Sequence, residues 1–253
     1  FVSSGNRADM IKRKWNWNDL GFLDMITAEI DEHGEFESLK PFKKTINKKF
    51  HEGPASFNKT GDYMVFTRNN YTGKSKEGVI KLKLFTSQKI NGVWQDPRPL
   101  MFNSDEYSTG HASLTPDGKT MYLASDMPGG FGGVDLYVCY KENDSLWSQP
   151  MNLGNSINTE GNEMFPFIHS SGSLFFSSDG LTGIGGLDVF MAKADGDGFS
   201  QAVNLGVPLN GNTDDFSFIM NEEMTGGYFS SDREDGKGNS DIYSFSLLKP
   251  LTY

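Results

Sequence analysis

The sequence has 253 residues, which is long for one compact domain, although all-β propellers, barrels and sandwiches often reach this length as a single unit. Its 29 glycines, 20 phenylalanines and 9 tyrosines are typical of a turn-rich all-β protein and exclude a disordered chain. A formal net charge of −10 argues against nucleic acid as the main partner, and no apolar stretch approaches the roughly 20 residues of a membrane-crossing helix.

A repeat with a period of 53 residues is plain in the second half of the sequence. The first copy starts at Phe1 and rejoins the pattern at GFLDMITAEI, and the second, also weak, starts at VFTRNNYTGKSKEGVIKLKLF. Three clear copies follow, MYLASDMPGGFGGVDLYV, LFFSSDGLTGIGGLDVFM and GYFSSDREDGKGNSDIYSF. An aromatic residue, often a proline, and an asparagine follow each of the first four copies, ending at Asn47, Asn103, Asn158 and Asn210.

One copy contains four strands. FPFIHSSGSLFFSSDG predicts two strands joined by a Ser-Gly turn, and GGLDVFMAKADGDGFSQAVNLG predicts a third strand, a turn and a fourth. A lone blade of this kind exposes both faces, so the copies must stack to bury them. We therefore expect an all-β fold, a β-propeller of about five four-stranded antiparallel blades, with six blades and missing upstream residues as the alternative.

The two ends of the pattern are incomplete. The first copy begins in its second strand, and the last ends at SLLKPLTY without a clear fourth strand. We expect residues 1–253 to form a single propeller domain that is a fragment of a longer multidomain protein.

Two aspartates flank the Gly-rich turn of each clear copy. The pairs are Asp126 and Asp135, Asp179 and Asp188, and Asp232 and Asp241. Carboxylates at such a turn would suit calcium, which is the one cofactor alternative. The other interpretation is that each aspartate accepts N–H groups of its own turn while the glycines supply positive φ. Because the pairs recur in every clear copy, we interpret them as structural and expect no bound metal or other cofactor.

Polar residues that differ between copies begin the predicted innermost strands, which line the central channel of a propeller. They are His51, Glu52, His111, Glu163, Asp214 and Asp215. Such a set would suit a metal or a peptide terminus. The alternative is an ordinary wet, polar channel mouth, which the lack of any H-x-x-x-H spacing favours.

A basic and aromatic insertion, IKRKWNWNDLGF, breaks the first copy. It contains Lys12, Arg13, Lys14, Trp15 and Trp17. Tryptophan anchors beside basic residues are typical of loops that contact glycans, anionic polymers or proteins. The alternative is a tryptophan that caps a blade edge, with the lysines only solvating it.

The pattern S-D-x-x-x-G-x-G-G-x-D-[LV]-[YF], followed by W-x-x-P-x-N-L-G and I-N-[ST], resembles the WD40-like repeats of TolB-type propellers. INTEGNEMFPFI, FNSDEYSTGHASLTPDGKTMYLASDMPGGFGGVDLY and DDFSFIM are more closely similar to the propeller of large OmpA-family proteins of the Bacteroidetes. The resemblance covers essentially the whole sequence. It implies a periplasmic, outer-membrane-associated component, and its PorE-like branch implies the type IX secretion system and protein transport.

These observations predict a non-catalytic protein-interaction scaffold whose partners are other envelope or secretion-system proteins. Peptidoglycan would be bound only through the flanking domain of the family, which this sequence lacks. The alternatives are a glycan-binding module, with Trp15 and Trp17 as its aromatic residues, and a glycoside hydrolase-like propeller, with Glu163 and Asp215 as the carboxylate pair. No G-x-S-x-G, H-E-x-x-H or phosphate-loop motif supports an enzyme.

Overall fold

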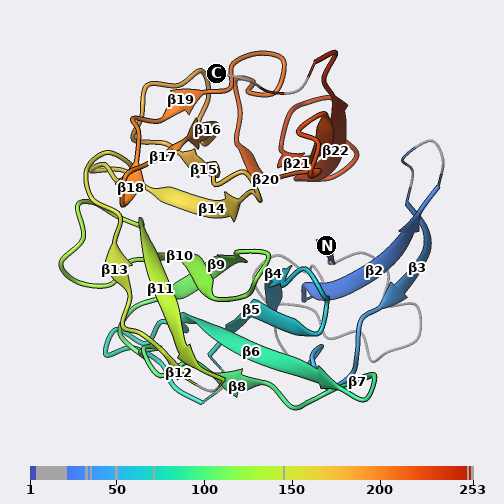
Figure 1. Ribbon diagram of the computed structural model, residues 1–253, viewed down its shortest axis with the longest axis vertical. Helices are drawn as coiled ribbons and strands as arrows, with labels where there is room; N and C mark the ends of the chain where they lie inside the picture. Colours follow the sequence, from blue (N-terminus) through green and yellow to red (C-terminus); the bar gives the residue numbers. More distant parts are fainter. Residues whose placement is uncertain are drawn as a thin grey trace. The chain divides into compact units, whose positions relative to one another are not determined.

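The computed structural model describes residues 1–3, 22–31, 34, 36–48, 51–70, 72–144, 146–249 and 251. These residues form 22 strands and no helix, so the all-β fold class is confirmed (Figure 1). Within this part of the chain there is accordingly no helix that could span a membrane. The chain divides into two compact units, Phe1–His111 and Ala112–Tyr253.

Unit 1 contains two antiparallel sheets. Blade 1 has the order β1-β2-β3, and blade 2 has the order β4-β5-β6, with the short strands β7 and β8 both pairing with β6. The bounds are β1 Val2–Ser3, β2 Asp24–Ile30, β3 Phe36–Pro41, β4 Glu52–Phe57, β5 Tyr63–Asn69, β6 Leu82–Ile90, β7 Val93–Trp94 and β8 Arg98–Pro99.

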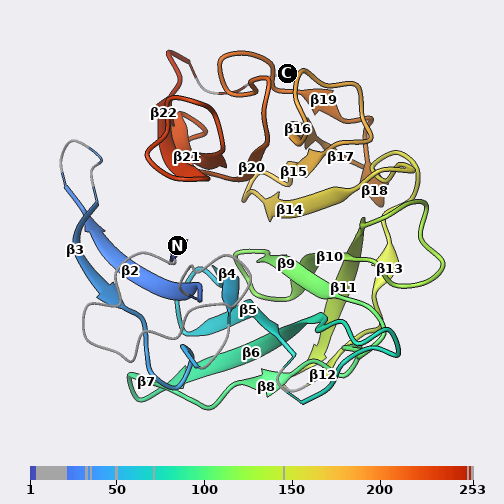
Figure 2. The same cartoon turned by 180° about the vertical axis from the view of Figure 1, so that it is seen from behind.

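The boundary between the units falls inside β9, and three sheets follow it in chain order (Figure 2). Blade 3 has the order β9-β10-β11, with β12 and β13 pairing with β11; blade 4 has the order β14-β15-β16-β19; and blade 5 has the order β20-β21-β22. A small hairpin, β17-β18, extends blade 4. The bounds are β9 Thr109–Leu114, β10 Thr120–Ser125, β11 Asp135–Asn143, β12 Leu146–Trp147, β13 Met151–Asn152, β14 Glu163–Ile168, β15 Leu174–Ser178, β16 Asp188–Ala192, β17 Ala194–Asp195, β18 Gly198–Phe199, β19 Val203–Asn204, β20 Asp215–Met220, β21 Gly226–Ser231 and β22 Asp241–Ser246.

These five sheets are the blades of a β-propeller, as the repeat predicts. The register of blade 1 also confirms that the first copy starts in its second strand. Ser3 of β1 pairs with Asp24, just as Ser178 pairs with Asp188 in blade 4.

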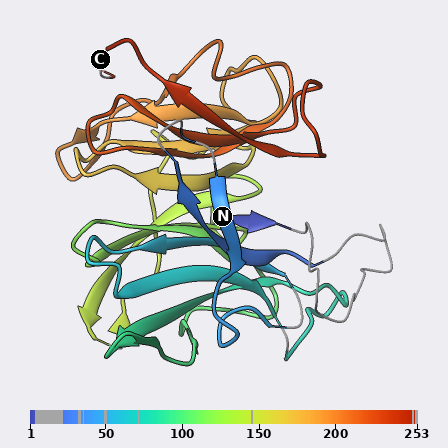
Figure 3. The ribbon, with the colours of Figure 1, turned by 90° about the vertical axis from the view of Figure 1, so that its right-hand side faces the viewer.

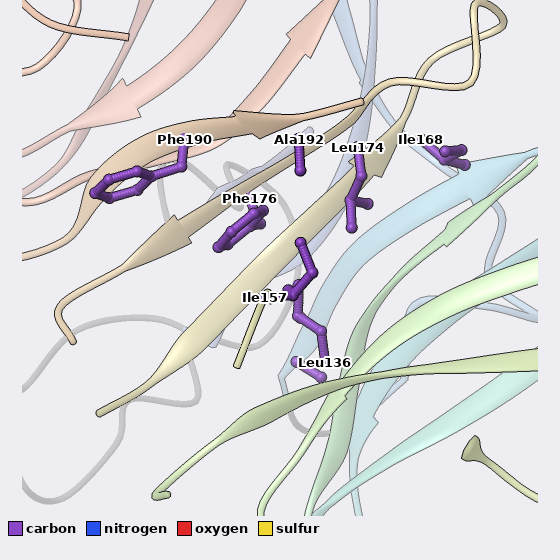
Figure 4. Close-up of a cluster of buried hydrophobic side chains, with 8 residues drawn as sticks. Leu136, Ile157, Ile168, Leu174, Phe176, Phe190 and Ala192 are labelled. Atoms are coloured by element: carbon purple, nitrogen blue, oxygen red, sulfur yellow. The ribbon is translucent and has the colours of Figure 1, made fainter. Parts of the chain in front are cut away.

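In blade 4 the second and third strands are buried on both faces, which explains why they are continuous apolar runs. In β15, Phe176 packs with Leu136 of blade 3 in one core cluster (Figure 4), whereas Phe175 packs with Phe218 of blade 5 in another. Alternate side chains of a strand point to opposite faces, so one strand contributes to two cores. A third cluster in unit 1 joins Met25 of blade 1 to the central strands of blade 2.

The innermost strands share a bulge that the sequence does not predict. His111, Phe165 and Ser217, each the third residue of its strand, have φ values of 50°, 52° and 53°. The register shifts at this point in β14 and in β20. A bulge of this kind bends a strand and redirects its side chains.

Candidate functional site

The acidic residues singled out in the sequence gather at one end of each blade. This loop end consists of the turn between the second and third strands and the connection that leads from the fourth strand to the next blade. In blade 4 it lies at the end of β15 and the start of β16, where Ser178 pairs with Asp188. Whether the loop end can bind a ligand or a metal therefore depends on which groups its carboxylates already contact.

Asp135, Asp188 and Asp241 accept hydrogen bonds from the backbone of their own Gly-rich turns. Oδ2 of Asp135 accepts from the N–H of Phe131 at 2.5 Å, and Asp188 accepts from the N–H groups of Ile184 and Gly185. Asp241 accepts from the N–H groups of Lys237 and Gly238, at 2.6 and 2.8 Å. Asp135 and Asp188 are fully buried, so these hydrogen bonds fix the backbone of the turns from the interior of the protein.

Paired glycines in these turns allow a close approach to the next blade. A Cβ atom on Gly132 would lie 2.4 Å from the carbonyl oxygen of Thr159, and one on Gly185 would lie 2.2 Å from that of Thr213. Backbone atoms cannot yield by that amount. The Gly-Gly signature therefore reports blade-to-blade contact.

An asparagine after each fourth strand forms the same two hydrogen bonds to the third strand. Nδ2 of Asn210 donates to the carbonyl oxygen of Val189 at 2.9 Å, and its Oδ1 accepts from the N–H of the same residue at 2.8 Å. Asn158 binds Leu136 in the same way. The equivalent pairs in unit 1 are Asn103 with Leu84 and Asn47 with Met25. We call this arrangement the asparagine clasp.

A second asparagine connects the clasp to the turn aspartate. Nδ2 of Asn204 donates to Asp188 at 2.9 Å, and its Oδ1 accepts from Asn210 at 2.8 Å. In blade 3, Asn152 makes the corresponding bonds to Asp135 and Asn158. The N-L-G motif of the sequence is thus part of a continuous polar network.

The residue before each inner-strand acid links its blade to the preceding one. Oδ1 of Asp214 accepts from the N–H of Leu187 at 2.8 Å, as Oδ1 of Asn162 accepts from that of Val134 at 3.1 Å. In unit 1, Nδ1 of His51 accepts from the N–H of Leu23 at 3.0 Å. His51 and Asp214 therefore occupy one structural position rather than unrelated ones.

The inner-strand acids Glu163 and Asp215 are fully buried and bound within their own loops. Glu163 accepts hydrogen bonds from the N–H and hydroxyl of Thr159 and from the hydroxyl of Ser178. Burial raises the pKa of Glu163, those bonds oppose the rise, and the carboxylate of Asp135 adds to it. Asp215 accepts from the N–H of Gly211 at 2.6 Å. These acids repeat in structure, although the sequence suggested that they were non-repeating.

Glu52 occupies the same position in blade 2, where its partner is a buried arginine. Nε of Arg68 lies 3.3 Å from Oε1 of Glu52, and its Nη2 donates to the carbonyl oxygen of Ile46 at 2.5 Å. The guanidinium lies over the rings of Phe66 and Phe85, at 5.0 and 4.9 Å from their centroids. Stacking and pairing together satisfy a cation that would otherwise be costly to bury.

Arg233 in blade 5 makes an equivalent set of contacts from a different place in the sequence. Its Nη2 donates to Oδ1 of Asp215 at 2.7 Å and to the carbonyl oxygen of Leu209 at 2.8 Å. The guanidinium lies over Phe229 and Tyr243, at 4.9 and 5.0 Å from the ring centroids. Neither arginine was singled out from the sequence, because nothing local marks it. Arg68 lies opposite Glu52 in the strand register, whereas Arg233 reaches Asp215 from the turn after β21.

The other predicted residues have separate roles or positions. His111 is at the bulge of β9, its N–H donates to Oγ1 of Thr67 at 2.9 Å, and burial lowers its pKa to about 4. Asp179 and Asp232 accept from the N–H groups of Asn162 and Asp214, both at 2.7 Å. Asp126 precedes the Gly-rich turn of blade 3 at the matching position. Lys12, Arg13, Lys14, Trp15 and Trp17 lie outside the described residues.

In the part of the chain that the structure describes, no three His, Cys, Asp or Glu side chains converge as a metal site. In blades 3 and 4, the exposed side chains at the tips of the Gly-rich turns are apolar. Phe131 and Ile184 occupy the tips of the turns in blades 3 and 4, and each side chain is 50% exposed. Their own N–H groups are the ones held by Asp135 and Asp188.

No family model and no curated protein matches the sequence. Among solved structures, TolB from Acinetobacter baumannii matches with a TM-score of 0.52 and 11% identity over 88% of this chain and 46% of that one. A puromycin-hydrolyzing peptidase from Mycobacterium tuberculosis (TM-score 0.49, 11% identity, 89% of this chain, 34% of that one) and an alpha-L-arabinofuranosidase from Lactobacillus brevis (0.44, 13%, 76%, 74%) also match. The chain spans about half the length of the TolB structure. At this identity the likeness shows the fold alone, which is the TolB-like β-propeller.

Proposed function

We propose that this chain is a non-catalytic protein-interaction propeller that binds its partner with the Gly-rich turns at the loop end. The observation that carries the proposal is the combination of a fixed backbone and an apolar tip. Phe131 and Ile184 are half-exposed, while buried carboxylates hold their N–H groups. A loop that is already ordered loses little entropy on binding, so its apolar side chains contribute more of their burial to affinity.

The same hydrogen bonds argue against hydrolysis at Glu163 and Asp215. A glycosidase needs two carboxylates that reach the substrate. Here both side chains are fully buried, and their oxygens accept bonds from Thr159, Ser178, Gly211 and Arg233. We therefore assign them a structural role in the loop end. The function that we propose uses no catalytic residue, metal or other cofactor.

We place this function in the periplasm, in an outer-membrane-associated assembly with other envelope or secretion-system proteins, type IX secretion included. The support is the resemblance of the repeat motifs to the propeller of Bacteroidetes OmpA-family proteins. In this proposal, peptidoglycan is contacted only through a domain outside this sequence.

The test is partner capture by the full-length protein, cross-linked in its host envelope. The variant combines Phe131→Ala with Ile184→Ala. The matched control combines Met151→Ala with Ile219→Ala, since these side chains are 50% and 48% exposed but lie on β13 and β20. We expect the first pair to lose most of the captured partner, the control to keep it, and both to melt at the wild-type temperature.

Equal capture by both pairs would contradict the proposal. The enzymatic alternative has its own test, in which Glu163→Gln and Asp215→Asn are assayed against a panel of aryl glycosides. Hydrolysis by the unaltered protein that both changes abolish without unfolding it would establish a glycosidase instead.

A further inference from the structure

The connection between blades 1 and 2 is unusually basic. Residues 38–51 contain five lysines and no aspartate or glutamate, whereas the corresponding connections after blades 3 and 4, residues 149–162 and 201–214, contain no lysine or arginine. The structure describes four of these lysines, and all four side chains are exposed: Lys40, Lys43, Lys44 and Lys48. We call them the lysine patch. Blade 1, whose strand β3 contains Lys40, is drawn in blue in Figures 1 and 3.

The backbone that bears the lysine patch is fixed by hydrogen bonds to β2 and within its own turn. The N–H of Phe42 donates to the carbonyl oxygen of Met25 at 2.8 Å, and Asn47 clasps the same residue. The carbonyl oxygen of Lys43 accepts from the N–H groups of Ile46 and Asn47, both at 2.9 Å. The lysines therefore project from an ordered turn, so a ligand that binds them does not have to order the backbone first.

The fold does not require a charge at these positions. In blades 1 and 4 the N–H of the clasp asparagine donates to the residue four positions before it, which is Lys43 in blade 1 and Gly206 in blade 4, at 2.9 Å in both. Lys44 therefore takes the position of Val207, which is 74% exposed. An exposed, uncharged position of blade 4 thus carries a cation in blade 1.

The lysine patch has no counter-ion within the described residues. None of its four ammonium groups forms an ion pair or a hydrogen bond there, whereas Nζ of Lys83 in blade 2 lies 2.6 Å from Oδ1 of Asp105. Like charges that are close together repel one another, so an anionic ligand would lower the electrostatic energy of the patch.

We infer that the lysine patch binds a short acidic segment of a partner polypeptide. Lysine ammonium groups act as separate point charges, which suits carboxylates that are spaced along an extended chain; a single phosphate is better held by the planar fork of an arginine. At physiological salt charges act over about 8 Å, so a short segment responds to the patch alone. A membrane surface or a long polyanion would also meet the acidic remainder of the chain, since residues 112–253 contain 6 Lys/Arg and 19 Asp/Glu.

This surface uses none of the residues of the proposed function, so the inference goes beyond that function and can fail independently of it. The probe is a fluorescein-labelled peptide of alternating glutamate and serine, and its binding to the full-length protein is followed by fluorescence anisotropy at about 50 mM salt, where screening is weak. In the control peptide, glutamine replaces each glutamate. Zero-length carbodiimide cross-linking followed by mass spectrometry then shows which lysines the bound carboxylates contact.

The patch variant combines Lys43→Gln with Lys44→Gln. The matched control combines Lys74→Gln with Lys76→Gln, which are exposed lysines between β5 and β6, so both variants have the same net charge. We expect the patch variant to bind the glutamate peptide about fivefold more weakly or less tightly still, and the control to change by less than about twofold. Both should melt at the wild-type temperature, and cross-links should concentrate at the lysine patch.

Four results would overturn the inference. They are no binding of the glutamate peptide, equal binding of the glutamine peptide, cross-links that fall outside the lysine patch, and equal losses for the two variants, which would show that only net charge matters. Cross-links between two copies of the protein at the lysine patch that the patch variant abolishes would identify a second copy as the occupant and would also refute the partner assignment.

Discussion

Blades 4 and 2 place an acid at the same position and satisfy it with different chemistry. In blade 4, Glu163 pairs across the strands with Ser178 and accepts its hydroxyl. In blade 2, Glu52 pairs across with Arg68, and the position of the turn aspartate next to it is taken by Lys83. The difference teaches that these two blades keep the acid and exchange the residues that face it, whereas blade 3 has Thr109 at the same position.

The largest expected effect comes from breaking the ionic version of this set. Arg68→Ala leaves Glu52 buried without its cation, so we expect a loss of about 3–5 kcal/mol in the free energy of unfolding. Urea denaturation measures it. Lys83→Ala is the control, because its partner Asp105 is exposed and little stability depends on that pair. A loss below about 1 kcal/mol for Arg68→Ala would mean that the ion pair does not hold blade 2.

Removing one asparagine clasp should have the next largest effect. Asn210→Ala leaves the N–H of Val189 buried without its acceptor and removes one of the two N–H donors to its C=O, which should cost about 2–4 kcal/mol. Asn155, exposed in the preceding loop, is the control, and its change to alanine should stay within about 0.5 kcal/mol. Equal effects in thermal unfolding would refute a structural role for the clasp.

Replacing equivalent turn aspartates should cost different amounts of stability, because the aspartates differ in burial. Asp188→Ala should cost about 1–3 kcal/mol, since buried N–H groups lose their acceptor. Asp241→Ala should cost less, because water can reach the half-buried turn and replace the carboxylate. Unchanged melting of Asp188→Ala, together with a loss of calcium binding measured by calorimetry, would favour the metal interpretation.

The smallest effect is a pH dependence that arises at His111. Burial lowers its pKa to about 4, from the ordinary value of 6.5, so the folded state favours the neutral ring. That contribution to stability is fully present above pH 6.5 and is lost as the pH falls toward 4, by about 1.5 kcal/mol between pH 6.5 and 5. His111→Asn, which tolerates the positive φ of the bulge, should lack this component. Parallel stability curves for the two proteins would contradict the prediction.

The sequence was sufficient to predict the blades, because the succession of strands and turns and the constant 53-residue period can be recognised without knowing which residues contact one another in the fold. Asp188 and Asn210 lie at the repeated positions that the sequence indicates. What it could not predict was the use of each side chain. Arg68 and Arg233 reach equivalent acids from positions that do not align, one from a strand and the other from the turn that follows a strand, so no repeat position marks them.

The inner-strand bulge was missed for a similar reason. Positive φ is uncommon for any residue other than glycine, and neither Phe165 nor His111 marks it in the sequence. Glu163 and Asp215 were also expected to line the channel, since the sequence does not reveal that their side chains are buried. Their hydrogen bonds to Thr159 and Gly211 become visible only when the loop that precedes each strand is in place.

Backbone hydrogen exchange at Phe131 and Ile184 tests the central claim most directly. If buried carboxylates hold the Gly-rich turns, these two amides should exchange slowly although their side chains are half-exposed. Asp188→Ala should then accelerate exchange at Ile184 and leave Phe131 protected. Fast exchange at both amides in the unaltered protein would show that the turns are mobile and would contradict the account.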